Sequence, residues 1–292
     1  MLETWRWFGP DDPISLEQIR QAGATGVVSS LSHIPTGEVW PLVDIETHKQ
    51  LIESAGLVWS VPLHNDIKTR SGHYQYLISN YQKTLINLGA AGIQTVCYNF
   101  MPVVDWTRTN LEYLLPDNSQ ALRFDIVDFA VYDIFVLQRS GASNSYDKSV
   151  VEGARERFGS LDQRAVAALE NNIIAGLPGG EGSYDRAGIL AAIEHFNQFD
   201  NEAYRQNLIA FLRDIMPAAE VADINMVIHP DDPPFSLFGL PRVLSTAEDV
   251  RKLVSAVPSA SNGLTLCAGS FGARGDNNLV AMAEEFGDRI HF

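Results

Sequence analysis

Short apolar runs recur along the chain, and amphipathic segments lie between most of them. The runs are rich in β-branched and aromatic residues, which is typical of strands buried on both faces of a sheet. They occupy residues 3–8, 26–31, 57–62, 93–100, 225–228 and 263–267. The segments between them carry helical capping residues and apolar spacing, at 15–23, 45–55, 74–88, 201–219, from 245 onward and at 278–286. This alternation predicts an α/β fold, a parallel sheet covered by helices, in the form of a TIM (β/α)8-type barrel.

The alternation breaks between about residues 103 and 200. Helices are predicted there at 150–158, 160–171 and 184–197, without strands between them. We therefore expect a long insertion after the fourth strand that forms a cap over the active face. Its glycine-rich stretch at 176–182 could cradle phosphate, but it follows no clear strand and lacks the Lys-Ser/Thr ending of a P-loop, which disfavours that interpretation.

The chain ends as a seventh strand begins, at 288–292. Six strands and the start of another do not close an eight-stranded barrel. The pattern therefore predicts one barrel domain over residues 1–292, interrupted by the insertion at 103–200, with a C-terminal portion absent from this sequence.

Composition narrows the class of protein. A chain of 292 residues with 46% hydrophobic residues can bury a large core. Its 36 acidic and 21 basic residues give a net charge of -15, which argues against nucleic acid or an anionic membrane as partner. The presence of only two cysteines and the lack of an apolar run of membrane-spanning length favour a cytoplasmic enzyme. The negative net charge of the chain is still compatible with an anionic small substrate.

Two apolar runs end in residues that can bind metal. His229 ends the fifth run before two acids and three prolines, and Cys267 ends the sixth. Because catalytic groups of α/β barrels lie at the carboxyl ends of strands, we interpret both as ligands of one divalent ion such as zinc, iron or manganese. The alternatives are a core histidine bonded to a carbonyl and a cysteine that acts as a small buried hydrophobe.

Further polar residues are candidates for less specific roles. Asp231 and Asp232 could orient the imidazole or simply form the turn before Pro233. Cys97 lies within a strand and is interpreted as core. His48, His73 and His195 fall on helices and are expected to be solvated.

Substrate contacts are predicted from residues at or just after the early strands. Arg6 lies on the first strand, where its guanidinium could meet a carboxylate or form an internal ion pair. His33 follows the second strand and His64 the third, although both could equally be ordinary polar loop residues.

Several longer strings resemble the mannonate dehydratase family over essentially the whole chain. They are 5–12 (WRWFGPDD), 21–28 (QAGATGVV), 33–40 (HIPTGEVW), 96–108 (VCYNFMPVVDWTR), 228–234 (IHPDDPP) and 263–267 (GLTLC). The resemblance implies a metal-dependent barrel of the xylose-isomerase-like kind. It also implies removal of water from D-mannonate to give 2-keto-3-deoxy-D-gluconate in hexuronate (glucuronate) breakdown, with Mn²⁺ or Fe²⁺.

The same resemblance assigns roles to individual residues. His229 and Cys267 match the family's metal ligands, whereas its other ligands and its catalytic His and Tyr would lie beyond Phe292. His291 does not match a ligand position. The stretch 58–64 is a few residues shorter than in the family and lacks an acid found there. Arg6, His33, His64 and Asn99 are expected to position the polyol.

Two other functions remain open at this point. One is a metal-dependent sugar isomerase or epimerase on the same barrel, and the other is an inactive truncated barrel that acts as a binding protein. A homodimer or tetramer is expected on general grounds, because most soluble oligomers are symmetric homo-oligomers.

Overall fold

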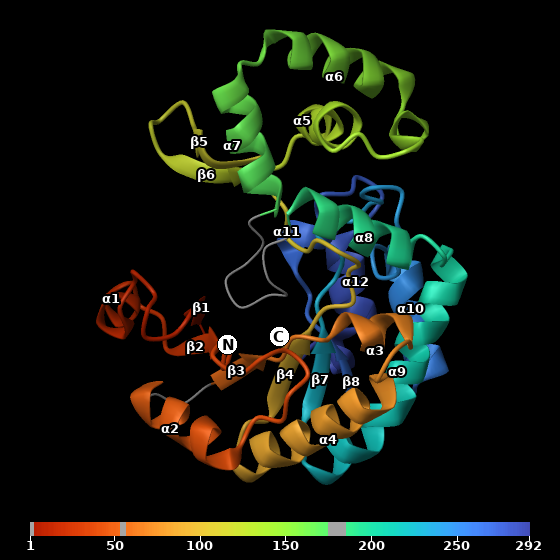
Figure 1. The fold of residues 1–292 in the computed structure, drawn as a ribbon. Coiled ribbons are helices and arrows are strands. Elements are labelled where there is room, and N and C mark those ends of the chain that lie inside the picture. Colours follow the sequence, from red (N-terminus) through yellow and green to blue (C-terminus); the bar gives the residue numbers. More distant parts are fainter. Residues whose placement is uncertain (1–2, 53–56, 175–184) are drawn as a thin grey trace.

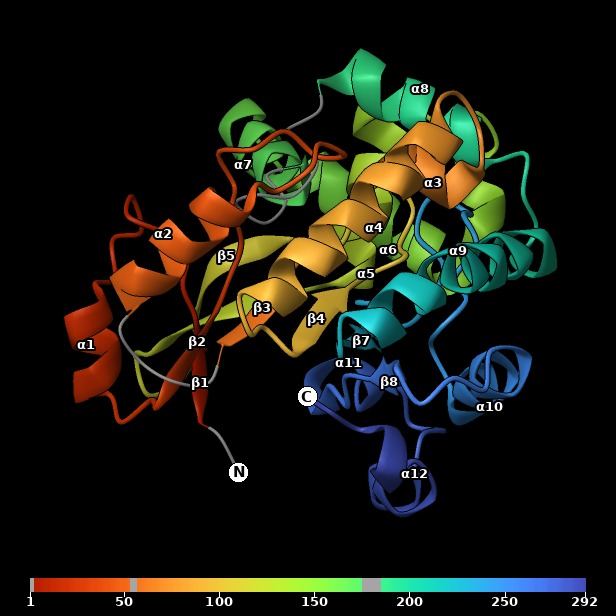
Figure 2. The same cartoon turned by 90° about the horizontal axis from the view of Figure 1, so that it is seen from below.

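The computed structural model describes residues 3–52, 57–174 and 185–292. Its centre is a six-stranded parallel sheet whose spatial order, β1-β2-β3-β4-β7-β8, is also the order along the chain. The strands are β1 (Thr4–Arg6), β2 (Gly26–Ser29), β3 (Leu57–Ser60), β4 (Thr95–Tyr98), β7 (Asn225–Ile228) and β8 (Asn262–Leu264). Figure 2 shows them following one another, with α2, α4 and α9 along one side of the row.

All six predicted strands are therefore confirmed, as is the start of a seventh. Leu264 pairs with Ile290 in a parallel bridge beyond β8. Within the described residues, no pairing joins β1 to this far edge, so the sheet shown is open. The sequence predicted a barrel type, and the structure shows the sequential parallel strands from which such a barrel is built.

Helices alternate with the strands because the connecting segments carry apolar faces and defined caps. Ser15 and Thr246 each form a capping box, and Asp200 caps the longest helix, so these starts lie where sequence signals placed them. The helices that cover the sheet are α1 (Leu16–Gln21), α2 (Leu42–Ile52), α3 (Asn65–Thr69), α4 (Tyr74–Ala90), α9 (Asn201–Val221), α10 (Ala247–Ala256), α11 (Ala268–Phe271) and α12 (Leu279–Glu285). None of the helices in the described ranges is long and apolar enough to cross a membrane.

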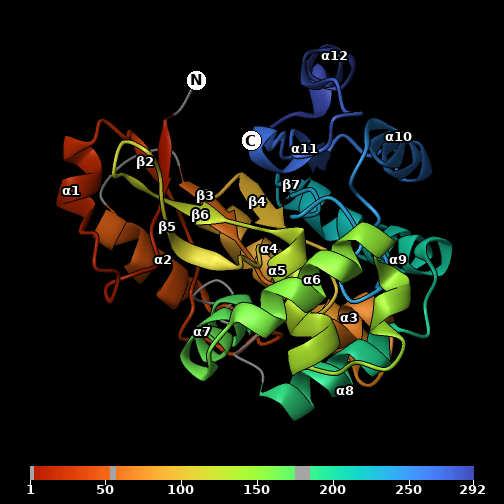
Figure 3. The same ribbon diagram turned by 90° about the horizontal axis from the view of Figure 1, so that it is seen from above.

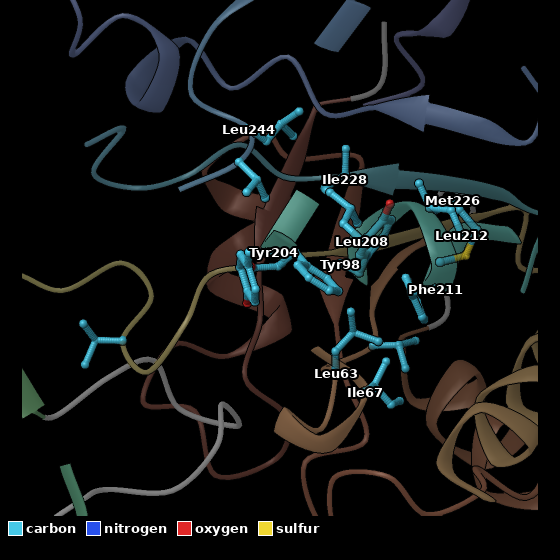
Figure 4. Close-up of a cluster of buried hydrophobic side chains, with 14 of the residues drawn as sticks. Leu63, Ile67, Tyr98, Tyr204, Leu208, Phe211, Leu212, Met226, Ile228 and Leu244 are labelled. Carbon is cyan, nitrogen blue, oxygen red and sulfur yellow. The ribbon is translucent and has the colours of Figure 1, made fainter. Parts of the chain in front are cut away.

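One buried apolar cluster lies between α9 and the strands β4 and β7 (Figure 4). Apolar side chains on one face of α9 cover this part of the sheet (Figure 4). The ring of Phe211 meets that of Tyr98 edge-on at 5.6 Å. Burial of each such side chain contributes about 1.5–3 kcal/mol, so this region holds the ends of β4 and β7 in fixed register.

The segment after β4 forms a separate layer. It contains β5 (Asn110–Leu114), β6 (Gln120–Arg123), α5 (Ile126–Val131), a π-helical turn (Tyr132–Val136), a 3-10 turn (Ala142–Ser145), α6 (Lys148–Ser160), α7 (Gln163–Ile174) and α8 (Arg186–Phe196). Figure 1 places β5 through α7 above the sheet, and Figure 3 shows them in front of the strands when viewed from that side. The three predicted helices are confirmed as α6, α7 and α8.

One feature of this segment was not predicted, and one predicted feature is not tested by the structure. The antiparallel hairpin β5–β6 was not predicted, because most of its side chains are exposed and its strands lack a buried apolar face. The glycine-rich stretch 176–182 lies outside the described residues.

One histidine predicted to be solvated is buried, and that prediction was wrong. His48 is 7% exposed. Its Nε2 lies 2.8 Å from Ser29 Oγ, and its ring stacks on Trp7 at 5.4 Å. The position belongs to the inner face of α2, together with Ile45 and Ile52.

Candidate active site

A cavity of about 430 Å³ opens where the parallel strands end. Each strand, or the residues just after it, contributes to its wall, which includes Arg6, Val28, Val61, Asn99, His229 and Cys267. Because all strands point the same way, their carboxyl ends bring together residues that are far apart in sequence. Three other hollows among the described residues are smaller, at about 190, 10 and 10 Å³.

His229 is fixed in position by backbone contacts. Its amide N–H donates to Tyr98 O at 2.7 Å, and its Nδ1 lies 2.8 Å from Pro230 O. Because a carbonyl oxygen only accepts, Nδ1 carries the proton and Nε2 keeps a free lone pair. The ring of Trp106 meets the imidazole edge-on at 4.9 Å. His229 is thus buried and oriented as metal-binding histidines are, with one nitrogen held and the other available.

Cys267 faces this imidazole from the other strand end. It lies three residues beyond β8, at the start of α11, and Ser270 Oγ donates to its Sγ at 3.2 Å. Burial raises the pKa of the thiol, but the hydrogen bond with His229, the charge of that ring and the contacts with Ser270 together lower the pKa to about 7. The contacts with His229 and Ser270 therefore favour the thiolate form of Cys267.

A divalent cation could take the place of the thiol proton of Cys267. A thiolate and a neutral imidazole are the forms in which these groups bind metal, and binding releases the proton. Among the described residues, no group of three or more His, Cys, Asp or Glu side chains is arranged to hold a metal ion. His229 and Cys267 could therefore supply two of the donors in a larger set of metal ligands.

The two cysteines should differ strongly in reactivity. Burial raises the pKa of Cys97 to about 11, although Thr265 and Arg6 partly offset this. In metal-free protein at pH 8, we expect iodoacetamide to alkylate Cys267 rapidly and Cys97 slowly, because only the thiolate reacts. The rate at Cys267 should rise with pH through a midpoint near 7, because a lowered pKa keeps the thiolate populated above that pH. Peptide mass spectrometry over a pH series measures both rates, and equal rates would contradict the assignment.

The structure places Arg6 and Asn99 in the same cavity as His229 and Cys267. The Arg6 guanidinium lies 4.9 Å from the centre of the Phe8 ring, and its Nη1 donates to Val28 O at 3.4 Å. Asn99 Nδ2 donates to Asp105 Oδ2 at 2.7 Å. Both side chains therefore have positions defined by neighbours from which they can contact a bound molecule.

His33 and His64 lie elsewhere. His33 borders a separate hollow of about 190 Å³ beside α2. His64 is the N-cap of α3, where its Nδ1 accepts from Asp66 N at 3.1 Å. Its ring borders a third, much smaller hollow next to Trp40. The structure therefore does not bring these two histidines to the cavity of His229.

The two acids after His229 do not contact the imidazole. Asp231 Oδ2 accepts from Leu244 N and from Ser245 Oγ, both at 2.8 Å. Asp232 pairs with both terminal nitrogens of Arg108, at 3.2 and 3.1 Å. The structure therefore favours the interpretation of these acids as turn residues over their interpretation as partners of the imidazole. Each acid also binds a second segment of the chain.

His291 does not face the cavity either. Its ring lies against Gly263, where an added Cβ would come within 2.4 Å of His291 Cδ2. The neighbouring Phe292 lines the cavity instead, as alternation along a strand dictates.

Three cavity residues were missed at the level of sequence. Asp105 and Trp106 follow β4 and could have been found by the strand-end criterion that identified Asn99. Lys68 lies on the short helix α3, and its 6% exposure could not be foreseen from a five-residue helix.

Comparisons with known proteins identify the family of the chain. The sequence model of the D-mannonate dehydratase (UxuA) family matches residues 1–292. The chain is 62% identical to a mannonate dehydratase of Saccharophagus degradans and 51% identical to mannonate dehydratase 2 of Agrobacterium fabrum. Each alignment covers 100% of this chain and 75% of the relative. The crystal structure of mannonate dehydratase from Streptococcus suis serotype 2 superposes with a TM-score of 0.75 at 34% identity, covering 100% of this chain and 72% of that one. This chain belongs to the D-mannonate dehydratase family.

Proposed function

We propose that this protein is a hydro-lyase that converts D-mannonate into 2-keto-3-deoxy-D-gluconate and water, as a step of hexuronate (glucuronate) breakdown. The observation that carries the proposal is the His229–Cys267 pair, two metal-binding side chains joined by a hydrogen bond inside a cavity large enough for a sugar acid. The family match over all 292 residues supports the same activity.

The reaction defines what the cavity has to supply. A weakly acidic proton leaves the carbon next to a carboxylate, and a hydroxyl leaves the neighbouring carbon after it is protonated. His229 and Cys267 would hold Mn²⁺ or Fe²⁺, which as a Lewis acid stabilises the negative charge that develops beside the carboxylate. Imidazole and thiolate suit such ions better than Mg²⁺ or Ca²⁺, which prefer oxygen.

Arg6 and Asn99 would position the polyol chain. Both line the cavity and are held by neighbouring groups, so their donors are oriented before a ligand enters. Positioning of this kind lowers the entropic part of a barrier. His33 and His64 are left out of this part of the proposal because they border other hollows.

The architecture we propose is one TIM-type barrel domain of the xylose-isomerase-like kind, with residues 103–200 as an insertion over the active face. The sequential parallel strands and the superposition on the Streptococcus suis enzyme support it. We further propose a cytoplasmic homodimer or tetramer, for which light scattering at several concentrations is the test.

The activity test is direct. Metal-loaded protein incubated with D-mannonate should form a 2-keto-3-deoxy sugar acid, detectable by periodate–thiobarbiturate colour and by mass spectrometry as a loss of one water. Aldoses serve as the control substrates, because an isomerase or epimerase of the same fold needs a carbonyl next to a hydroxyl. Turnover of an aldose without turnover of D-mannonate would replace the proposal with that second activity. Binding of D-mannonate without turnover would indicate a binding protein.

A further inference from the structure

A buried lysine faces the cavity without an acidic partner in the described part of the chain. Lys68 lies on α3, is 6% exposed and lines the cavity beside Met101. Its Nζ donates to Met101 O at 3.2 Å. Among the residues that the structure describes, no carboxylate oxygen lies within 4.0 Å of this nitrogen. An ammonium group has three donors, so its charge and part of its hydrogen-bonding capacity are left for another molecule.

Such a group is costly to bury unless something pairs with it. Removing an ammonium from water carries a free-energy penalty that a single carbonyl contact does not offset. A ligand with a negative charge would offset it, and the proposed substrate is a monoanion.

The contacts of Lys68 place its charge on the side of the cavity nearest His229. Tyr98, the last residue of β4, pairs with Ile228 of β7 and accepts the amide N–H of His229. Met101 follows β4, and its Sδ accepts from Asp232 N at 3.1 Å. Because Lys68 Nζ is bound to the carbonyl of that methionine, it lies where β4 and β7 end.

The other cation in the cavity is Arg6. It lies on β1, the edge strand of the row, whereas His229 follows β7. Asp12 and Cys97 already interact electrostatically with its guanidinium. Arg6 is therefore the weaker candidate for a carboxylate that must also lie beside His229 and Cys267.

We propose that Lys68 binds the carboxylate of the sugar acid and that Arg6 contacts the opposite, polyol end. This inference rests on the proposed function and adds to it the direction in which the substrate lies. Lys68 thereby makes the site select an acid over the corresponding uncharged polyol.

The test compares D-mannonate with its amide, D-mannonamide, which has the same hydroxyls and no charge. Dissociation constants are measured by isothermal titration calorimetry on Mn²⁺-loaded protein, and KM and kcat are measured with D-mannonate. We expect Lys68→Met to weaken D-mannonate binding about 10- to 100-fold, because a charge-assisted contact is lost, and to leave D-mannonamide binding nearly unchanged. Lys68→Arg should recover part of the preference for the acid.

Two further variants complete the design. Arg6→Met should weaken the acid and the amide by similar factors, because it acts on the hydroxyl end. Lys49→Met is the matched control: Lys49 also donates to a main-chain carbonyl, Ala91 O at 2.6 Å, but lies outside the cavity, so both ligands should bind as in the wild type.

The outcomes separate this inference from the activity on which it rests. If the wild type converts D-mannonate and Lys68→Met keeps the wild-type preference for acid over amide, the role of Lys68 is overturned and the activity stands. If Lys68→Met loses both ligands equally, the lysine has only a structural role and the inference is again overturned. If the wild type neither binds nor converts D-mannonate, the proposed function itself fails.

Discussion

Replacing Cys267 by serine should remove most of the bound metal and reduce kcat/KM for D-mannonate by about 10³-fold or more. Serine keeps the size of the side chain but not the thiolate, which forms near neutral pH because the pKa of Cys267 is about 7. A Lewis-acidic ion contributes several kcal/mol of charge stabilisation, and each 1.36 kcal/mol corresponds to tenfold in rate. Metal content is measured by inductively coupled plasma mass spectrometry after dialysis, and activity by formation of the 2-keto-3-deoxy acid.

The chain provides its own control for this experiment. Cys97 lines the same cavity, but its pKa is raised to about 11 and its Sγ lies 3.6 Å from Thr265 Oγ1. Cys97→Ser should therefore keep most of the metal and of the activity. His229→Ala should reproduce the loss seen with Cys267→Ser. A Cys267→Ser protein with full metal content and wild-type kcat/KM would show that the metal, if one is used, binds elsewhere.

The strands could be predicted because their chemistry is local. Strands buried on both faces are continuous apolar runs, and the helices between them carry cap residues such as Ser15 and Thr246 whose hydrogen bonds lie within a few residues. His48 shows the limit of classing residues by type alone. The spacing of His48 from Ile45 and Ile52 places it on the inner face of α2, so the helical pattern alone predicts its burial. The prediction failed because histidine was treated as a polar surface residue.

The site could be predicted only in part because strand-end position does not determine where a side chain points. His229 and Cys267 lie together because the sheet order places β7 beside β8. His64 also follows a strand, but its side chain caps α3 and accepts the Asp66 N–H instead of facing the cavity. Lys68 enters the cavity through a contact with Met101, which is 33 residues away in sequence, and no local pattern reports such a contact.

Asp231 should be the residue near His229 whose loss most reduces stability. Its buried carboxylate lies 3.9 Å from Arg242, which is itself buried, donates to Val104 O at 3.4 Å and interacts electrostatically with Asp105 and Asp232 as well. Burial raises the pKa of Asp231 and lowers that of Arg242, so each ion is disfavoured without the other. Asp231→Ala removes the carboxylate with the largest effect on the guanidinium and should reduce the free energy of unfolding by about 3–5 kcal/mol, which is roughly 10 °C in Tm.

Two further variants test whether the charge of Arg242 causes the loss of stability in Asp231→Ala. Asp232→Ala breaks the partly exposed pair with Arg108 and should cost only about 1 kcal/mol. The double variant Asp231→Ala/Arg242→Met removes both buried charges and should recover much of the loss, whereas a loss as large as that of Asp231→Ala alone would show that the hydrogen bonds to Leu244 and Ser245 dominate. Urea unfolding of the four proteins gives these free energies. The same loop carries His229. Recovery of stability in the double variant would therefore also show that the end of β7 can fold without this ion pair.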